Sequence, residues 1–211
     1  MKYHIISVFP ESTSSYLASS LLKRAKESGI IDTHFYNLRD YTEDKHNKVD
    51  DRPYGGGPGM VLSAEPMIAA LEEALSKGTK SLVIFFSPHG EEFSNKMADE
   101  LKGEYTDIIF VCGHYEGVDA RVKEIFEMRD VSIGNYVLTG GELPALVMID
   151  AITRRLPGVL GDELSVEENR IAGKDVYTRP ECFEYKDKEY CVPEVLKSGN
   201  HAKIDEFRKG E

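Results

Sequence analysis

The sequence has few cysteines, no long apolar run and fewer basic than acidic side chains. Its 3 cysteines, Cys112, Cys182 and Cys191, form no CxxC pair, so we expect a reduced chain without a disulfide framework. No apolar stretch approaches the roughly 18 residues that span a bilayer. Met1–His4 carries no signal-peptide pattern and leads directly into a predicted strand. These absences predict a cytoplasmic protein with no membrane partner.

Charge and composition bound the class of protein further. The 37 acidic and 26 basic residues give a formal net charge of −11. Proteins that bind nucleic acids usually present a basic face, so this balance argues mildly against such a partner, although the total hides any local basic patch. With 211 residues, 41% of them hydrophobic, the chain fits one large domain, or one domain with a smaller appendage, around a buried core.

Common nucleotide and metal motifs are absent. There is no GxxxxGK[ST] sequence, and Gly55-x-Gly57 lacks the third glycine of GxGxxG because Met60 stands in its place. No HExxH and no paired CxxC occurs, so we predict no protein-held zinc site. Ser87 and Ser198 lack the context of a nucleophile elbow. The loop histidines lie apart in the sequence, and we interpret each as an ordinary hydrogen-bonded side chain: His46, His89, His114 and His201.

Apolar runs alternate with amphipathic segments along the first three quarters of the chain. Strands are predicted at Tyr3–Phe9, Ile30–Tyr36, Ser81–Phe86, Asp107–Cys112 and Asp130–Ile133. Helices are predicted at Ser14–Ser28, Ala64–Leu75, Ser94–Leu101, Val118–Phe126 and Ala145–Arg154. This alternation predicts an α/β fold in which helices cover both faces of a mostly parallel sheet.

Glycine-bearing loops follow three of the predicted strands, at Ser87, Gly113 and Gly134. The last of these belongs to Ser132–Pro144, whose apolar residues and exposed backbone groups suit a flat, adenine-like ring. On its own that stretch is better interpreted as a plain strand-to-helix turn. Ligands of parallel sheets bind at the carboxyl edge, so three such loops together favour a ligand site. The long polar passage Asn37–Asp51 is of a kind that is functional or disordered.

The pattern changes after Pro157. Gly158–Lys174 is polar and rich in acidic residues, and a hairpin is predicted near Tyr185–Val192 before the beginning of a last helix. We therefore expect a domain over residues 1–157, a flexible linker over 158–176 and a separate C-terminal segment over 177–211.

The residues also resemble a known family, the bacterial TrmD tRNA (guanine-N1)-methyltransferases of the SPOUT superfamily. The strings VDDRPYGGGPGM at 49–60 and SIGNYVLTGGELPA at 132–145 are long and specific. The matching segments run in order through the whole chain: Ile5–Pro10, Val49–Met60, Ser87–Gly90, Val111–Asp119, Ser132–Pro144, Arg154–Gly161, Tyr177–Glu181 and Ser198–Ala202.

The resemblance implies a deep C-terminal trefoil knot in the sheet domain, an obligate homodimer, and active sites built from both chains. It also implies that the knot loops bind S-adenosyl-L-methionine in a bent form. By motif match, the cofactor contacts fall on Ser87, Pro88, Gly113, Tyr115, Glu116, Gly117, Ile133, Gly134, Asn135, Tyr136, Val137, Leu138, Gly140, Gly141 and Pro144.

The activity that the resemblance implies is methylation of N1 of the guanine 3′ of the anticodon in tRNA, with which Mg²⁺ is associated. The base proton must leave as the methyl group arrives, so a general base is expected. In the family this is a linker aspartate, helped by an arginine that falls on Arg154 near the guanine O6. Glu116 is counted among the catalytic candidates as well as the cofactor contacts.

This sequence departs from the family at several positions. The linker aspartate is Asn169, which cannot take a proton, and the linker is shorter, so Asp175, Glu168 or Glu167 is a substitute candidate. His114 replaces a usual arginine and Asn135 a usual aspartate. Family members continue beyond the SGNHA motif into a basic tRNA-binding domain, so residues 177–211 are expected to be the start of that domain, truncated at Glu211.

Two alternatives stay open beside the methyltransferase. One is a knotted homologue that binds cofactor or RNA with weak or no activity, which Asn169 would explain. The other is a nucleotide-binding module unrelated to RNA, which the acidic balance allows. Binding of S-adenosyl-L-methionine excludes the last, and methyl transfer to tRNA distinguishes the first two.

Overall fold

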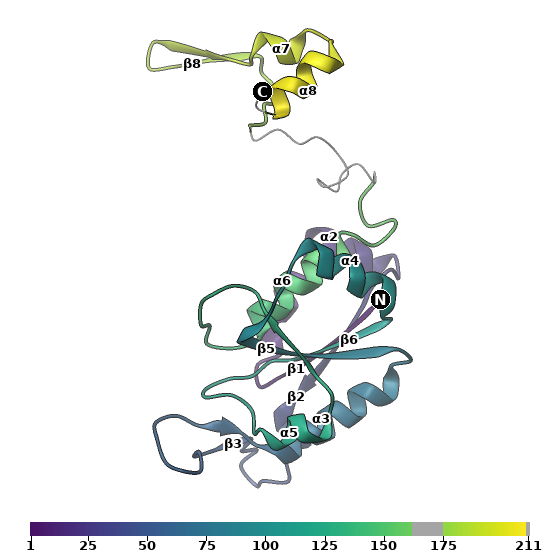
Figure 1. Ribbon diagram of the computed structural model, residues 1–211, viewed down its shortest axis with the longest axis vertical. Helices are drawn as coiled ribbons and strands as arrows, with labels where there is room; N and C mark the ends of the chain where they lie inside the picture. The colour runs from purple at the N-terminus through teal and green to yellow at the C-terminus, as the bar shows by residue number, and fades with distance from the viewer. Residues whose placement is uncertain (162–174, 210–211) are drawn as a thin grey trace. The chain divides into compact units, whose positions relative to one another are not determined.

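The computed structural model describes residues 1–161 and 175–209, which divide into two units, Met1–Val159 and Leu160–Glu211 (Figure 1). The larger unit contains a 5-stranded sheet of order β2-β1-β6-β5-β7. All of its neighbouring strands pair in parallel. The predicted α/β class with a mostly parallel sheet is therefore confirmed. The strands of this sheet are β1 (Lys2–Ser7), β2 (Asp32–Asn37), β5 (Ser81–Glu92), β6 (Asp107–Val111) and β7 (Arg129–Ser132).

Helices cover both faces of this sheet (Figure 1). The larger unit contains α1 (Glu11–Leu17), α2 (Ser20–Glu27), a 3-10 helix η1 (Leu38–Tyr41), α3 (Ala64–Lys77), α4 (Asn95–Glu104), α5 (Arg121–Ile125) and α6 (Glu142–Thr153). Two short strands, β3 (Asp50–Asp51) and β4 (Val61–Leu62), pair with each other. The smaller unit contains the hairpin β8 (Cys182–Tyr185) and β9 (Lys188–Cys191), followed by α7 (Glu194–Lys197) and α8 (His201–Lys209).

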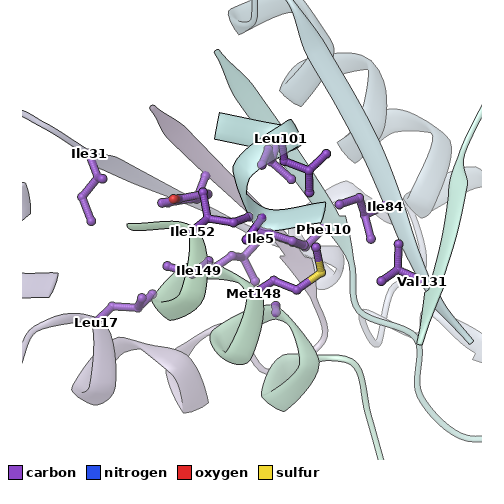
Figure 2. Packing of buried hydrophobic residues seen from close by; sticks show 14 of the residues in the cluster. Ile5, Leu17, Ile31, Ile84, Leu101, Phe110, Val131, Met148, Ile149 and Ile152 are labelled. Atoms are coloured by element: carbon purple, nitrogen blue, oxygen red, sulfur yellow. The ribbon is translucent and has the colours of Figure 1, made fainter. Parts of the chain in front are cut away.

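Successive side chains of each buried strand pack into two different hydrophobic clusters, one on each face of the sheet. Ile5 and Phe110 pack on one face with residues of α1, α2, α4 and α6, as Figure 2 shows for Met148, Ile149 and Ile152 of α6. Ile6 and Val111 pack on the other face with α3 and α5. Because a strand turns alternate side chains to opposite faces, a continuous apolar run is what a doubly covered parallel strand requires.

Two predicted elements differ from the structure. The helix expected over Ser14–Ser28 is two helices, because the backbone breaks at Ser20, whose φ is 45°. The strand expected to end at Phe86 continues to Glu92, since Phe86 and Glu91 both pair with Val131 and the residues between them bulge out. The Ser87–Gly90 loop is therefore a bulge within β5 and remains at the sheet edge.

The expectation of three unpaired cysteines is wrong. Cys182 and Cys191 are directly opposite each other in the β8–β9 hairpin, their Cα atoms 4.1 Å apart, and their sulfurs are bonded. Spacing alone could not reveal this pair, because the position of the turn at Lys186–Asp187 decides which residues face each other. Cys112 is free and fully buried, and burial raises the pKa of its thiol well above its ordinary value.

Within the described residues, the structure contains no helix that combines the length and the apolar character needed to cross a bilayer.

A buried polar cluster at the amino edge of the sheet predicts a pH dependence of stability. His4 lies between the Tyr36 hydroxyl, 2.8 Å from Nδ1, and the Asp107 carboxylate, 3.1 Å from Nε2. Burial lowers the pKa of His4, against the opposing effect of Asp107. For Asp107, burial alone would raise the pKa, but hydrogen bonds from Thr106 and His4 lower it overall.

Both shifts have the same consequence, because the unfolded chain binds these protons more readily than the folded one. Stability is expected to fall as the pH drops below about 6.5, the unfolded-state pKa of histidine, and again below about 3.9 for the aspartate. Urea unfolding at pH 7.5 and 5.0 tests this for His4→Gln. We expect the stability gap between wild type and variant to narrow in acid. His46→Gln, at an exposed histidine in a loop, is the control. A difference in stability between wild type and His4→Gln that stays constant with pH would contradict the assignment of this pH dependence to His4.

Candidate functional site

A cavity of about 310 Å³ lies at the carboxyl edge of the sheet. The β5 bulge, the loop after β6 and the loop after β7 meet there. Parallel strands present their carboxyl ends at one edge, which explains why three segments distant in sequence form one site.

Glycines allow these segments to approach one another. A Cβ at Gly90 would lie 2.6 Å from the backbone of Asp130, and one at Gly141 would lie 2.6 Å from Cys112 Cα. Gly134 has a φ of 151°, and the Tyr136 ring folds back against it while its hydroxyl donates to the Ile133 carbonyl. Side chains at these positions would displace the walls of the cavity.

Backbone hydrogen bonds join the loops around the cavity. The Gly141 N–H donates to the Gly113 carbonyl over 3.1 Å, which ties the loop after β7 to the loop after β6. The Glu116 N–H donates to the Met60 carbonyl over 3.0 Å, so the glycine-rich segment before β4 also packs on this site. At Gly59 in that segment, a Cβ would lie 2.4 Å from the Glu116 carboxylate.

A buried chain of polar groups supports the floor of the site. Nε2 of His114 lies 2.9 Å from both carboxylate oxygens of Glu142, in the first turn of α6. The Ser7 hydroxyl, at the end of β1, donates to the same carboxylate. The Phe9 ring meets His114 edge-on, with ring centroids 5.3 Å apart. The hydrogen bonds that Ser7 and His114 make with Glu142 thereby hold the loop after β6 and the end of β1 against the start of α6.

The structure brings together the predicted cofactor residues except one. Every residue in that set lines the cavity apart from Asn135. Sequence reasoning did not assign the following lining residues: Phe85, Phe86, His114, Val131, Ser132 and Thr139. The phenylalanines and Val131 carry only a strand pattern, and the role of His114 depends on Glu142, which is 28 positions away.

The predicted catalytic residues are not gathered at this cavity, apart from Glu116. Arg154 is the C-terminal cap of α6, whereas Glu142 at the other end adjoins the cavity. The helical rise separates these positions by about 18 Å. Asp175 is exposed and belongs to the smaller unit. Asn169, Glu167 and Glu168 lie outside the described residues.

One group of three possible metal ligands occurs in the described part of the chain, namely Cys182, Glu189 and Cys191. Its two sulfurs are bonded to each other, which removes the thiolates that zinc would need. No part of the cavity at the sheet edge belongs to this group.

The cavity suits a flat ligand with an apolar body and a cationic end. Phe86, Ile133 and Leu138 supply apolar surface, and the glycines leave backbone groups open for hydrogen bonds. The exposed Glu116 carboxylate adds a negative charge at the rim.

Comparison with known proteins agrees with this geometry. A family model described as tRNA (Guanine-1)-methyltransferase TrmD matches residues 1–211. A tRNA (guanine-N(1)-)-methyltransferase from Carboxydothermus hydrogenoformans is 49% identical, covering 99% of this chain and 81% of the relative. Proteins of the same name from Clostridioides difficile and Moorella thermoacetica are 46% and 47% identical, covering 100% and 99% of this chain and 92% and 84% of the relatives. The chain therefore belongs to the tRNA (guanine-1)-methyltransferase TrmD family, a family of enzymes.

Proposed function

We propose that this protein transfers the methyl group of S-adenosyl-L-methionine to N1 of the guanine 3′ of the anticodon in tRNA. The observation that carries the proposal is the cavity at the sheet edge, whose lining coincides with the family's motifs in a chain matched by the family model along its whole length. We further propose that the loops around this cavity form a trefoil knot, that residues 1–157, 158–176 and 177–211 act as domain, linker and RNA-binding segment, and that the enzyme works in the cytoplasm.

A transfer assay tests the function directly. With labelled S-adenosyl-L-methionine, we expect label in a tRNA transcript carrying guanine 3′ of the anticodon, and none in the same transcript with adenine there. Nuclease digestion should yield 1-methylguanosine. Cofactor binding without transfer would favour the second candidate, a binding homologue with weak activity, for which the amide at Asn169 is the specific reason.

Methyl transfer changes the charge or protonation of three atoms, namely the sulfonium sulfur, guanine N1 and guanine O6. When bound, S-adenosyl-L-methionine would supply the methyl group from its sulfonium, with cleavage of the S–CH₃ bond, and would leave as the neutral thioether S-adenosyl-L-homocysteine. Guanine N1 forms the new C–N bond and loses its proton to a base, so negative charge grows on O6 as the proton leaves. We assign stabilisation of O6 to the Arg154 guanidinium and attraction of the ligand's cationic end to Glu116. Glu116 is also the side chain that would hold a Mg²⁺ ion at this cavity, because Mg²⁺ keeps most of its waters and needs only one or two carboxylates from the protein.

We propose that the active site is shared between two chains. Arg154 follows the last residue of the helix whose first turn adjoins the cavity, which supports an arginine supplied to each cavity by a second copy. The outward side of α6 is apolar, with Leu143 59% and Val147 45% exposed. Large exposed apolar residues on one helix face suit a protein partner.

A homodimer is therefore expected in solution. Light scattering should give twice the chain mass of 23.7 kDa. Leu143→Asp with Val147→Asp should shift the mass toward one chain, because each charge would be buried without a partner. Glu72→Asp, on the exposed side of α3, is the control. A wild type that is monomeric at micromolar concentration would contradict the proposal.

The amide at Asn169 predicts slow methyl transfer. A positioned base typically contributes about 10²–10⁴-fold, so Asn169→Asp is expected to raise the single-turnover rate at least about tenfold. If Asp175 or Glu168 acts as the general base instead of residue 169, Asn169→Asp should change the rate little. In that case Asp175→Asn or Glu168→Gln should lower the rate at constant cofactor affinity. A fast wild type that none of these substitutions alters would show that the base does not lie on this linker.

A further inference from the structure

The β8–β9 hairpin separates two kinds of side chain onto its two faces. Its register pairs Phe183 with Tyr190 and Tyr185 with Lys188. Because paired residues share a face and alternate residues change face, these four side chains lie together. The other face carries the Cys182–Cys191 disulfide and the paired Glu184 and Glu189. One face is therefore aromatic and basic, and the other is acidic.

The aromatic face offers flat rings that are open to solvent. Phe183 and Tyr185 are each 58% exposed and Tyr190 is 41% exposed. The Phe183 and Tyr190 rings are stacked, with centroids 5.6 Å apart and an angle of 16° between their planes. Lysine ammonium groups lie over the two tyrosines, Lys188 at 5.1 Å from the Tyr190 centroid and Lys186 at 5.3 Å from the Tyr185 centroid.

The hairpin is built to hold these rings in place. Lys186 and Asp187, between the strands, both have positive φ, as in the tight two-residue turns that fit the strand twist. The disulfide joins the strands at the opposite end from this turn. Within the smaller unit, Figure 1 shows the hairpin extending away from α7 and α8. The rings thus form a preorganised surface and not a buried core.

We propose that this aromatic face binds unpaired bases of the tRNA substrate by stacking. The inference rests on the proposed function, which makes tRNA the substrate. Flat aromatic rings beside cationic groups are what RNA-binding proteins use for unstacked bases, and the lysines complement the phosphates. The carboxylates Glu184 and Glu189 face away from the rings, so the acidic side chains of the two strands lie on the opposite face. A protein partner would have no comparable need for lysines placed over the rings.

Binding of an unmodified tRNA transcript to the 211-residue chain tests the proposal. Phe183→Leu with Tyr190→Leu keeps an apolar cross-strand pair but removes both flat faces. We expect a loss of affinity of roughly five- to hundredfold, as for removal of base–aromatic stacking. Glu184→Gln with Glu189→Gln, the pair on the opposite face, is the matched control and should bind at least as tightly as wild type.

A spectroscopic readout separates stacking from a general loss of fold. 2-Aminopurine placed in turn at the anticodon-loop positions should be quenched at one or more positions by wild type and the acidic-face variant, and at none by the leucine variant. Equal affinity and quenching in the leucine variant would overturn the inference while wild-type methyl transfer still stands. A leucine variant that loses dimerisation instead would assign the face to a second chain and also overturn it. If wild type neither methylates nor binds tRNA, the proposed function fails first.

Discussion

Gly140→Val is expected to abolish binding of S-adenosyl-L-methionine. A Cβ at Gly140 would lie 2.4 Å from His114 Nε2 and 2.5 Å from the Glu142 carboxylate. A branched side chain therefore has to break the buried pair of His114 and Glu142 and push apart the two loops that line the cavity. We expect the dissociation constant measured by calorimetry to rise at least about 100-fold, or roughly 2.7 kcal/mol.

Two other glycines make this experiment specific. A Cβ at Gly103 in α4 would have nothing within 4 Å of it, so Gly103→Ala should leave cofactor affinity unchanged. Gly113 lines the cavity, but a Cβ there meets only Val118, at 3.6 Å, which is ordinary contact. A loss of affinity in Gly113→Ala would consequently report contact with the ligand and not a distorted fold. Undiminished affinity in folded Gly140→Val would remove the cavity from consideration as the cofactor site.

Local sequence patterns predicted the sheet because three of its strands, β1, β6 and the first half of β5, carry apolar runs. The run Asp107–Val111 is buried throughout, as a strand covered on both faces must be. The alternation of strands and helices then brought three loops to one edge, and the glycines in those loops indicated close approach. These patterns located the site at that edge, whereas the individual lining residues were named by motif match to the family.

What the sequence could not predict depends on partners distant in the chain. The β5 bulge exists because Phe86 and Glu91 share Val131, a residue about 40 positions later. The disulfide depends on a turn whose register no spacing rule supplies. His114 was predicted to be a hydrogen-bonded loop histidine, which is confirmed, but its partner Glu142 lies 28 positions away and could not be named from the sequence. Long-range pairing, and not propensity, decides each of these features.

Arg154→Ala is expected to lower the methyl-transfer rate about 10²–10³-fold, the loss typical of removing one donor to a developing oxyanion. Single-turnover measurements at saturating S-adenosyl-L-methionine should show the drop, with cofactor affinity unchanged because the guanidinium is assigned to the guanine O6 and not to the cofactor. Arg154→Lys should restore only part of the rate, since a lysine keeps the charge but not the planar fork of donors. An equal loss of cofactor affinity in Arg154→Ala would contradict this separation of roles.

The same substitution decides whether one chain or two form the active site. In a shared site, an Arg154→Ala chain retains a sound cavity and a Gly140→Val chain retains the arginine. Mixing and reassembling the two inactive proteins should therefore create one working site in each mixed dimer. Random assortment makes half of the dimers mixed, so activity should return to about a quarter of the wild-type value. If mixed dimers form but stay inactive, the arginine and the cavity act within one chain, and the separation of about 18 Å along α6 would have to close by a rearrangement of that chain.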